Sequence, residues 1–201
     1  MSHRTAAPSH GVRQMRQASR VVPEARLEVT EHGLAPGGEG WFVVNARETC
    51  WRGTEGRGSL TDFDGDYEFA QVGIHVFVLE PGSPMSMYHW EVDQEDFLVV
   101  SGEALLIVEG QERMLRAWDF VHCPPETKHT IVGAGDGPSV IVAVGARSSR
   151  STGPDWGGYT VDEAALRHGA GVAEDTTKQD EAYASVPHRT FTRYREGWLP
   201  E

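Results

Sequence analysis

The fold is decided by residues 72–102, which have the sequence VGIHVFVLEPGSPMSMYHWEVDQEDFLVVSG. β-branched, aromatic and other apolar residues recur here in three short runs, at 72–79, 85–91 and 97–100. Such runs favour β-strands, and residues that form turns separate them, as in Pro81-Gly82-Ser83-Pro84 and Ser101-Gly102. Many short strands joined by tight turns are typical of an all-β sandwich or barrel.

The same pattern extends in both directions along the chain. Further strands are expected at 41–45, 104–108, 120–122, 129–132 and 139–144, and a loop rich in glycine and acidic residues at 52–67. No helical pattern long enough for a βαβ crossover interrupts them, which excludes a parallel sheet. We therefore predict an antiparallel all-β domain.

Changes in composition divide the chain into three parts. Residues 1–20 are rich in arginine and lack apolar periodicity, so we expect a disordered arm, with the β-barrel at 21–147 and a C-terminal extension at 148–201. Within the extension we expect one short helix at about 160–168, capped by Thr160 and ended by Gly169. The terminal aromatic residues Tyr194 and Trp198 should dock, either on the barrel or on a neighbouring subunit.

Composition limits the classes of function. The chain has 201 residues, 39% of them apolar, which is enough for a core, and a formal net charge of −12. Outside the arginine-rich arm the charge is strongly acidic, so binding of nucleic acid by the folded part is not expected. The sequence has no run of about 18 apolar residues that would span a membrane and no apolar secretory signal. With only two cysteines, Cys50 and Cys123, we expect a cytoplasmic protein without disulfides.

Residues with metal-binding chemistry cluster around residue 90. Side chains two apart on a strand share one face, so Met87, His89 and Glu91 are expected on one side and Tyr88 and Trp90 on the other. Glu95 follows across a turn, and His129 begins a later strand. Imidazole nitrogen and carboxylate oxygen together suit Zn, Fe, Mn, Ni or Co.

The spacing of these residues resembles the two conserved motifs of cupins. Gly82, His89-Trp90-Glu91, Glu95 and Gly102 resemble the first motif, and Pro124-Pro125-Glu126-Thr127-Lys128-His129 resembles the second. The sequence departs from the family at three points: Glu91 replaces the second histidine, Glu126 replaces the turn glycine, and the first spacing is one residue longer.

This resemblance implies a cupin-type antiparallel β-barrel, also called a double-stranded β-helix or jelly roll, with a metal site inside it. Carried over position by position, the family's ligands correspond to His89, Glu91, Glu95 and His129, which would hold one divalent ion. Two roles remain open for Glu91, a fourth ligand or a general base beside the metal.

Other polar residues have structural alternatives. His75 shares a strand face with Phe77 and Leu79, and it is either a weaker candidate for acid–base catalysis inside the barrel or a hydrogen-bonded core histidine. Of His122 and Cys123, one should point inward, where packing is the default role. The acidic segment Asp62–Asp66 does not match an EF-hand, since its glycine stands at the fourth position.

Two functions follow from the resemblance. The first is a mononuclear metalloenzyme that acts on a small polar metabolite inside the barrel, with isomerase-like or dioxygenase-like chemistry, which the residues do not separate. The second is a non-catalytic cupin that binds a sugar or small acid as a sensor or store. In both cases we expect a homodimer, with Tyr88, Trp90 and the terminal aromatic residues offering apolar area for the contact.

Overall fold

The computed structural model describes residues 21–148 and 153–201, and the arginine-rich arm at 1–20 lies outside this range. Its strands are β1 (Leu27–Thr30), β2 (Gly33–Pro36), β3 (Cys50–Thr54), β4 (Arg57–Asp62), β5 (Val72–Leu79), β6 (His89–Glu91), β7 (Glu95–Ser101), β8 (Glu103–Val108), β9 (Gln111–Arg116), β10 (Phe120–Cys123), β11 (His129–Ala134), β12 (Ser139–Ala146), β13 (Gly157–Tyr159) and β14 (Thr190–Thr192). Two short helices, α1 (Glu163–Arg167) and α2 (Gln179–Ala182), lie in the C-terminal part.

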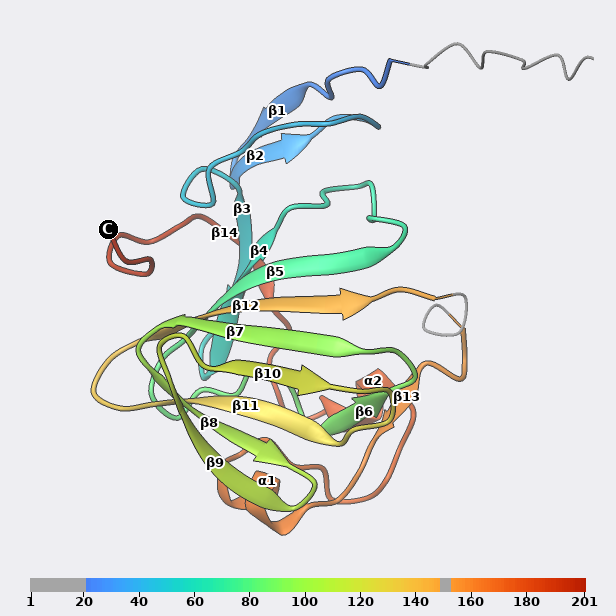
Figure 1. Ribbon diagram of the computed structural model, residues 1–201, viewed down its shortest axis with the longest axis vertical. Helices are drawn as coiled ribbons and strands as arrows, with labels where there is room; N and C mark the ends of the chain where they lie inside the picture. The colour runs from blue at the N-terminus through green and yellow to red at the C-terminus, as the bar shows by residue number, and fades with distance from the viewer. Residues whose placement is uncertain (1–20, 149–152) are drawn as a thin grey trace, which may run out of the picture.

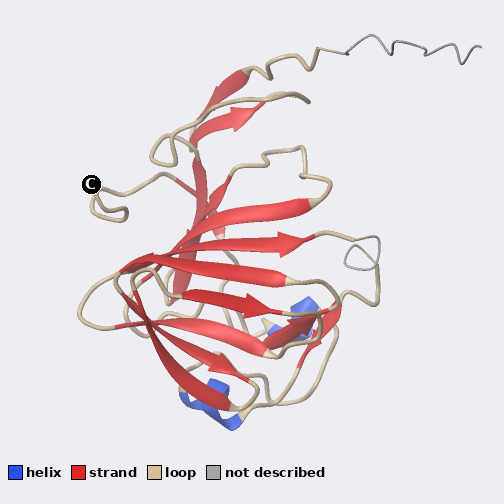
Figure 2. Ribbon diagram, in the orientation of Figure 1, coloured by secondary structure: helices blue, strands red, loops and turns tan. Residues whose placement is uncertain are grey.

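The strands form two large sheets that face each other (Figures 1 and 2). One has the order β10-β7-β12-β5-β4-β3-β14 and the other the order β13-β6-β11-β8-β9, while β1 and β2 form a separate pair. Within the described part of the chain, every pair of strands in these sheets is antiparallel. The predicted all-β, antiparallel fold class is therefore confirmed.

Apolar side chains from both sheets meet between them. The main core contains Phe77, Leu79, Met85, Phe97, Val99, Ala104, Leu106, Leu115, Val121, Cys123, Ile131, Ile141 and Ala143. These residues come mainly from the strands expected from the sequence, and β5 spans the predicted residues 72–79. Alternation along these strands sends every second side chain into this core.

The N-terminal third differs from the sequence prediction. No strand forms at 41–45, where Trp41 makes only an isolated bridge with Glu24 and the Val43 side chain is exposed. The expected loop at 52–67 instead contains most of β3 and all of β4. Cross-strand pairing decides both outcomes, because strand propensity is weak without a partner and a glycine-containing segment becomes a strand when it has one.

The C-terminal extension adds a strand to the barrel. β13 pairs with β6, with Tyr159 opposite His89, although no pattern in the sequence predicts a strand there. The helix α1 lies within the expected range 160–168 but begins later, at Glu163, and its N-cap is Asp162, whose carboxylate accepts a hydrogen bond from Ala165 N at 2.9 Å. The prediction that Thr160 caps the helix is wrong. Asp162 is the residue directly before the first turn, where a side-chain oxygen reaches the free backbone N–H groups.

The helix α1 covers the outside of the second sheet (Figure 1). Its residues Ala164 and Ala165 pack on Tyr88 and on Ile107 of β8. Tyr88 is only 2% exposed as a result, so the expectation that it offers apolar area for a dimer contact is wrong. The homodimer itself stays a prediction.

The end of the chain packs on the first sheet. The Trp51 side chain is fully buried, and its ring lies 6.1 Å from the Tyr194 ring and 5.0 Å from the Trp198 ring. Of the two docking places considered for the terminal aromatic residues, the structure shows the barrel of the same chain. No helix within the described ranges has the length and apolar character needed to cross a membrane.

Candidate metal centre

A cavity of about 540 Å³ opens into the barrel between the two sheets. His89, Glu91, Glu95 and His129 line it, so all four side chains expected to bind a metal face the same space. The cavity is within the range of volumes typical of sites for small ligands. A site for a small molecule and the candidate ligands therefore coincide.

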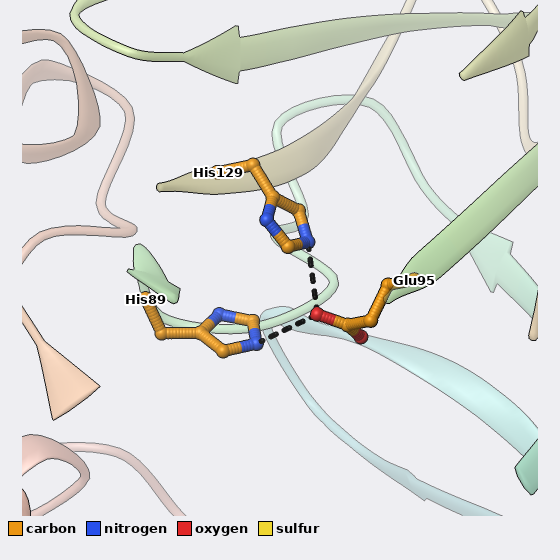
Figure 3. A group of neighbouring side chains, drawn as sticks. All are labelled: His89, Glu95 and His129. Atoms are coloured by element: carbon orange, nitrogen blue, oxygen red, sulfur yellow. Dashed lines mark ion pairs between the residues drawn. The ribbon is translucent and has the colours of Figure 1, made fainter. Parts of the chain in front are cut away.

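The candidate ligands stand at the ends of three strands. His89 begins β6, Glu95 begins β7 and His129 begins β11. His129 and His89 are direct partners in the antiparallel pairing of β11 with β6, which places their rings 5.1 Å apart. Figure 3 shows the two imidazoles and the Glu95 carboxylate pointing toward one another.

The distances between these three side chains suit a single ion. Glu95 Oε2 lies 3.4 Å from His129 Nε2 and 3.7 Å from His89 Nε2. Ligand atoms about 2.1 Å from a tetrahedral metal ion lie about 3.4 Å from each other. The three residues also form the group whose ligand atoms all lie within 4.8 Å of one another.

Both histidines present the nitrogen that a metal needs. His89 Nδ1 lies 2.8 Å from Met87 O, and His129 Nδ1 lies 3.0 Å from Thr127 O. Because a carbonyl oxygen only accepts, each Nδ1 donates its proton, so in the neutral form of each ring the lone pair is on Nε2, which faces the centre. Hydrogen bonds of this kind orient metal-binding histidines.

Two buried polar atoms at the centre have no hydrogen-bond partner among the described residues, Glu95 Oε2 and His129 Nε2. A buried polar atom without a partner is costly, by roughly 1–3 kcal/mol. A cation between these atoms would satisfy both. The residues present therefore fit a divalent metal ion, and two imidazole nitrogens with one carboxylate oxygen suit Zn, Fe, Mn, Ni or Co.

Burial and mutual charge shift the pKa values of all three groups. Burial raises the pKa of the Glu95 carboxyl to about 7, with a further contribution from the charge of Glu91, while His89 acts in the opposite direction. Burial and the charge of His89 lower the pKa of His129 to about 4. Burial alone would lower the pKa of His89, but the carboxylates of Glu91 and Glu95 outweigh it and raise that pKa.

Glu91 stands beside the three-residue group. Its Oε1 lies 3.7 Å from His89 Nε2, yet it is not part of the group with ligand atoms within 4.8 Å. Its side chain is 27% exposed, against 16% for Glu95 and 3% for His129. Ligation by Glu91 remains a prediction, and so does its alternative role as a base.

Residues 75–145 match the family model for the cupin domain. This chain contains a cupin domain. The match runs from within β5 to within β12 and includes all four candidate ligands of the two motifs. No curated protein matches the chain.

Three solved structures illustrate how partial the likeness to individual cupins and other proteins is. A sugar phosphate isomerase of the cupin superfamily from Silicibacter pomeroyi is 26% identical, over 45% of this chain and 60% of its own length, with a TM-score of 0.41. The polyketide cyclase RemF from Streptomyces resistomycificus is 11% identical, over 53% and 79%, with a TM-score of 0.46. An RmlC-like cupin family protein from Methanocaldococcus jannaschii is 22% identical, over 39% and 72%, with a TM-score of 0.37. This chain thus covers less than two thirds of the isomerase.

The turns of the two cupin motifs show how the backbone accommodates one departure from the family pattern, the glutamate at position 126. Gly102 has a φ of 76°, and a Cβ atom there would lie 2.6 Å from Pro138 O, so only glycine fits. Glu126, at the position of the family's turn glycine, has a φ of 69°. The turn therefore keeps the left-handed backbone that glycine favours, although a glutamate occupies it.

The other candidates from the sequence lie around the cavity or outside it. His75 lines the cavity and its Nδ1 donates to Thr61 O at 2.8 Å, so it is a hydrogen-bonded histidine of the cavity wall, and its role in acid–base catalysis stays a prediction. Of the next pair, Cys123 is the buried one, and burial raises the pKa of its thiol to about 12. His122 is exposed and pairs with Asp96 at 2.6 Å.

Two cationic side chains of the cavity were missed by the sequence analysis, Arg147 and Arg189. Arg147 follows β12, and Arg189 lies directly before β14 in the C-terminal extension. Neither belongs to a motif, and only the folding of the chain end across the barrel brings Arg189 to the cavity. Nothing in the local sequence would have identified it.

Proposed function

We propose that this cupin binds one divalent metal ion through His89, Glu95 and His129 and acts on a small polar metabolite in the barrel cavity. The single observation that supports this most strongly is the pair of buried atoms Glu95 Oε2 and His129 Nε2, 3.4 Å apart and without hydrogen-bond partners in the described part of the chain. A divalent ion bound between the Glu95 carboxylate and the neutral His129 imidazole would satisfy both buried atoms.

The arrangement favours proton transfer as the chemistry. When bound, a divalent ion would act as a Lewis acid that polarises a carbonyl or hydroxyl oxygen of the metabolite. Glu91 lines the same cavity and is more exposed to it than Glu95, so its carboxylate can take a proton from a bound molecule. Movement of a proton next to a polarised oxygen is the chemistry of isomerases, which we therefore favour over reaction with dioxygen.

His75 supplies a second proton-transfer group on another wall of the cavity. Because its Nδ1 donates to Thr61 O, its Nε2 can accept a proton. His75 lies on β5 in the first sheet, whereas Glu91 lies on β6 in the second. A molecule bound between them would have an acid–base group on each side.

Metal analysis of purified protein tests the site. We expect protein purified without added metal to carry close to one ion per chain, and His129→Ala to lose nearly all of it, because a buried ligand cannot be replaced from solvent. His122→Ala is the matched control, since His122 is exposed and pairs with Asp96 outside the cavity. Equal metal content in His129→Ala and wild type would disprove the proposed site.

The variant Glu91→Gln separates the two roles of this residue. If Glu91 acts as a base, the variant should keep its metal and lose turnover of candidate hydroxycarbonyl substrates by about 10²-fold or more. If Glu91 is a ligand, its metal content should fall as in His129→Ala. Metal-free wild-type protein that still binds a sugar would support the non-catalytic sensor or store instead.

A further inference from the structure

Arg189 brings a positive charge into the cavity from outside the cupin domain. It lies directly before β14, where the pairing of Thr190 with Gly53 of β3 fixes the backbone. Its guanidinium lines the cavity that also contains His89, Glu95 and His129. The C-terminal extension therefore completes one wall of the candidate site.

Two backbone carbonyls hold the Arg189 guanidinium in place. Nε donates to Gly58 O at 2.9 Å and Nη2 donates to Met85 O at 2.6 Å. An arginine has five N–H donors, so three remain after these two bonds. The carbonyls orient the group without neutralising its charge.

The charge of Arg189 is not balanced by an acid. Arg147, the other guanidinium of the cavity, pairs with Asp64 at 2.8 Å, whereas no carboxylate among the described residues forms an ion pair with Arg189. Burial, together with the nearby charge of Arg57, lowers the pKa of Arg189 to about 10. A partly buried cation held in a fixed position without a counter-ion favours an anion.

Three carboxylates line the cavity, Glu68, Glu91 and Glu95, and none of them forms an ion pair with Arg189. Glu95 belongs to the candidate metal group and Glu91 lies beside it, so a divalent ion there would offset their two negative charges. With the metal end of the cavity neutralised in this way, Arg189 would be the group that attracts a negative ligand. The cavity would then offer a metal to bind one group of a metabolite and a guanidinium to bind another.

We infer that Arg189 recognises a carboxylate or phosphate group of the metabolite, so that the substrate class is a small anionic compound. The inference rests on the proposed function, since it concerns the ligand of the same cavity. Guanidinium groups bind both kinds of anion through two parallel hydrogen bonds, for which Arg189 retains the donors.

Titration with simple anions tests the inference. Inorganic phosphate and acetate would be titrated separately into the full chain by calorimetry at constant ionic strength, and the tighter of the two identifies the anionic group. We expect Arg189→Met to bind that anion at least about tenfold more weakly than wild type. Arg193→Met is the matched control, because Arg193 lies on the same chain end and donates to Glu31 O at 2.7 Å outside this cavity.

Two further measurements keep the outcomes distinct. Arg189→Lys keeps the positive charge but not the planar fork, so it should bind the anion with intermediate affinity even if Arg189→Met folds poorly. The metal content of Arg189→Met should equal that of wild type. Unchanged anion affinity in Arg189→Met, or no binding of either anion to wild type, would overturn the inference about Arg189. Neither result would bear on the metal site, which the metal content of His129→Ala tests separately.

Discussion

The residues that line the cavity come from two different parts of the chain. The candidate metal group, which is the metal end of the proposed site, consists of His89, Glu95 and His129, all within the residues 75–145 that match the cupin model. The cationic end depends on Arg189, which reaches the cavity from the C-terminal extension. On the proposed function, the cupin domain would hold the metal, while Arg189 of the surrounding segments would select the molecule that binds beside it.

The same division applies to the packing around the metal end. Trp156 and Tyr159 belong to the extension, and their rings lie 6.4 Å and 6.0 Å from the His89 ring. The Trp51 side chain, before the matched residues, holds the end of the chain against the first sheet. If this comparison is right, the flanking segments and the cupin domain unfold together as one cooperative unit.

The largest expected effect on the free energy of unfolding concerns Trp51, whose substitution tests whether the flanking segments and the cupin domain form one unit. Trp51→Ala should lower the free energy of unfolding by about 3–5 kcal/mol, because it removes a fully buried ring and the surface on which Trp198 packs. Trp41→Ala, at a half-exposed ring, should change it by less than about 0.5 kcal/mol. Chemical denaturation followed by circular dichroism measures both. A separate early transition for the chain end, with the barrel unaffected, would show that the segments are independent.

The metal end could be predicted from the sequence because the patterns that identify it are short. Each short run of apolar residues between turns predicts a strand by itself, and β5, β8, β11 and β12 lie at or within two residues of the expected ranges. The spacing of His89, Glu95 and His129 resembles a known motif, so their convergence followed from the resemblance.

The surrounding segments could not be predicted in the same way. β13 is a glycine-rich strand of three residues that forms through pairing with β6 on one side and a bridge from Tyr159 to Thr176 on the other. Arg189 is an ordinary arginine in a polar segment until the chain end crosses the barrel. Such features depend on contacts between distant residues, which no short-range pattern contains.

A second prediction concerns the contact between the C-terminal extension and the residues that lead into β6, the strand that begins with His89. Met87 N donates to the Tyr183 hydroxyl at 3.0 Å, and Met87 O in turn accepts from His89 Nδ1. Tyr183→Phe leaves the buried Met87 N–H without a partner and should cost about 1–2 kcal/mol in thermal or chemical unfolding.

The control for this prediction is the same substitution at Tyr194. The Tyr194 hydroxyl is buried and has no hydrogen-bond partner in the described part of the chain. Tyr194→Phe should therefore be neutral or slightly stabilising, since it removes an unsatisfied polar atom. No loss in Tyr183→Phe would mean that packing of the retained ring, and not the hydrogen bond to Met87 N, connects the extension to the site.

The smallest expected effect concerns a departure within the cupin motifs themselves. Glu126 has a φ of 69° and an exposed side chain. A left-handed backbone costs a residue with a Cβ atom about 1–2 kcal/mol, whereas glycine loses about 0.5–1 kcal/mol through its greater freedom in the unfolded chain. Glu126→Gly should therefore raise the free energy of unfolding by about 0.5–1 kcal/mol.

Glu126→Ala distinguishes backbone strain from charge, because alanine removes the carboxylate but keeps the Cβ atom. We expect no gain in stability from it, as measured by denaturant midpoint beside Glu126→Gly. A gain of the same size in both variants would assign the effect to repulsion among acidic side chains near the metal end. A gain in stability in Glu126→Gly alone would show that the turn keeps a left-handed backbone that glutamate disfavours. Such a turn is expected to persist if it positions His129 at the start of β11.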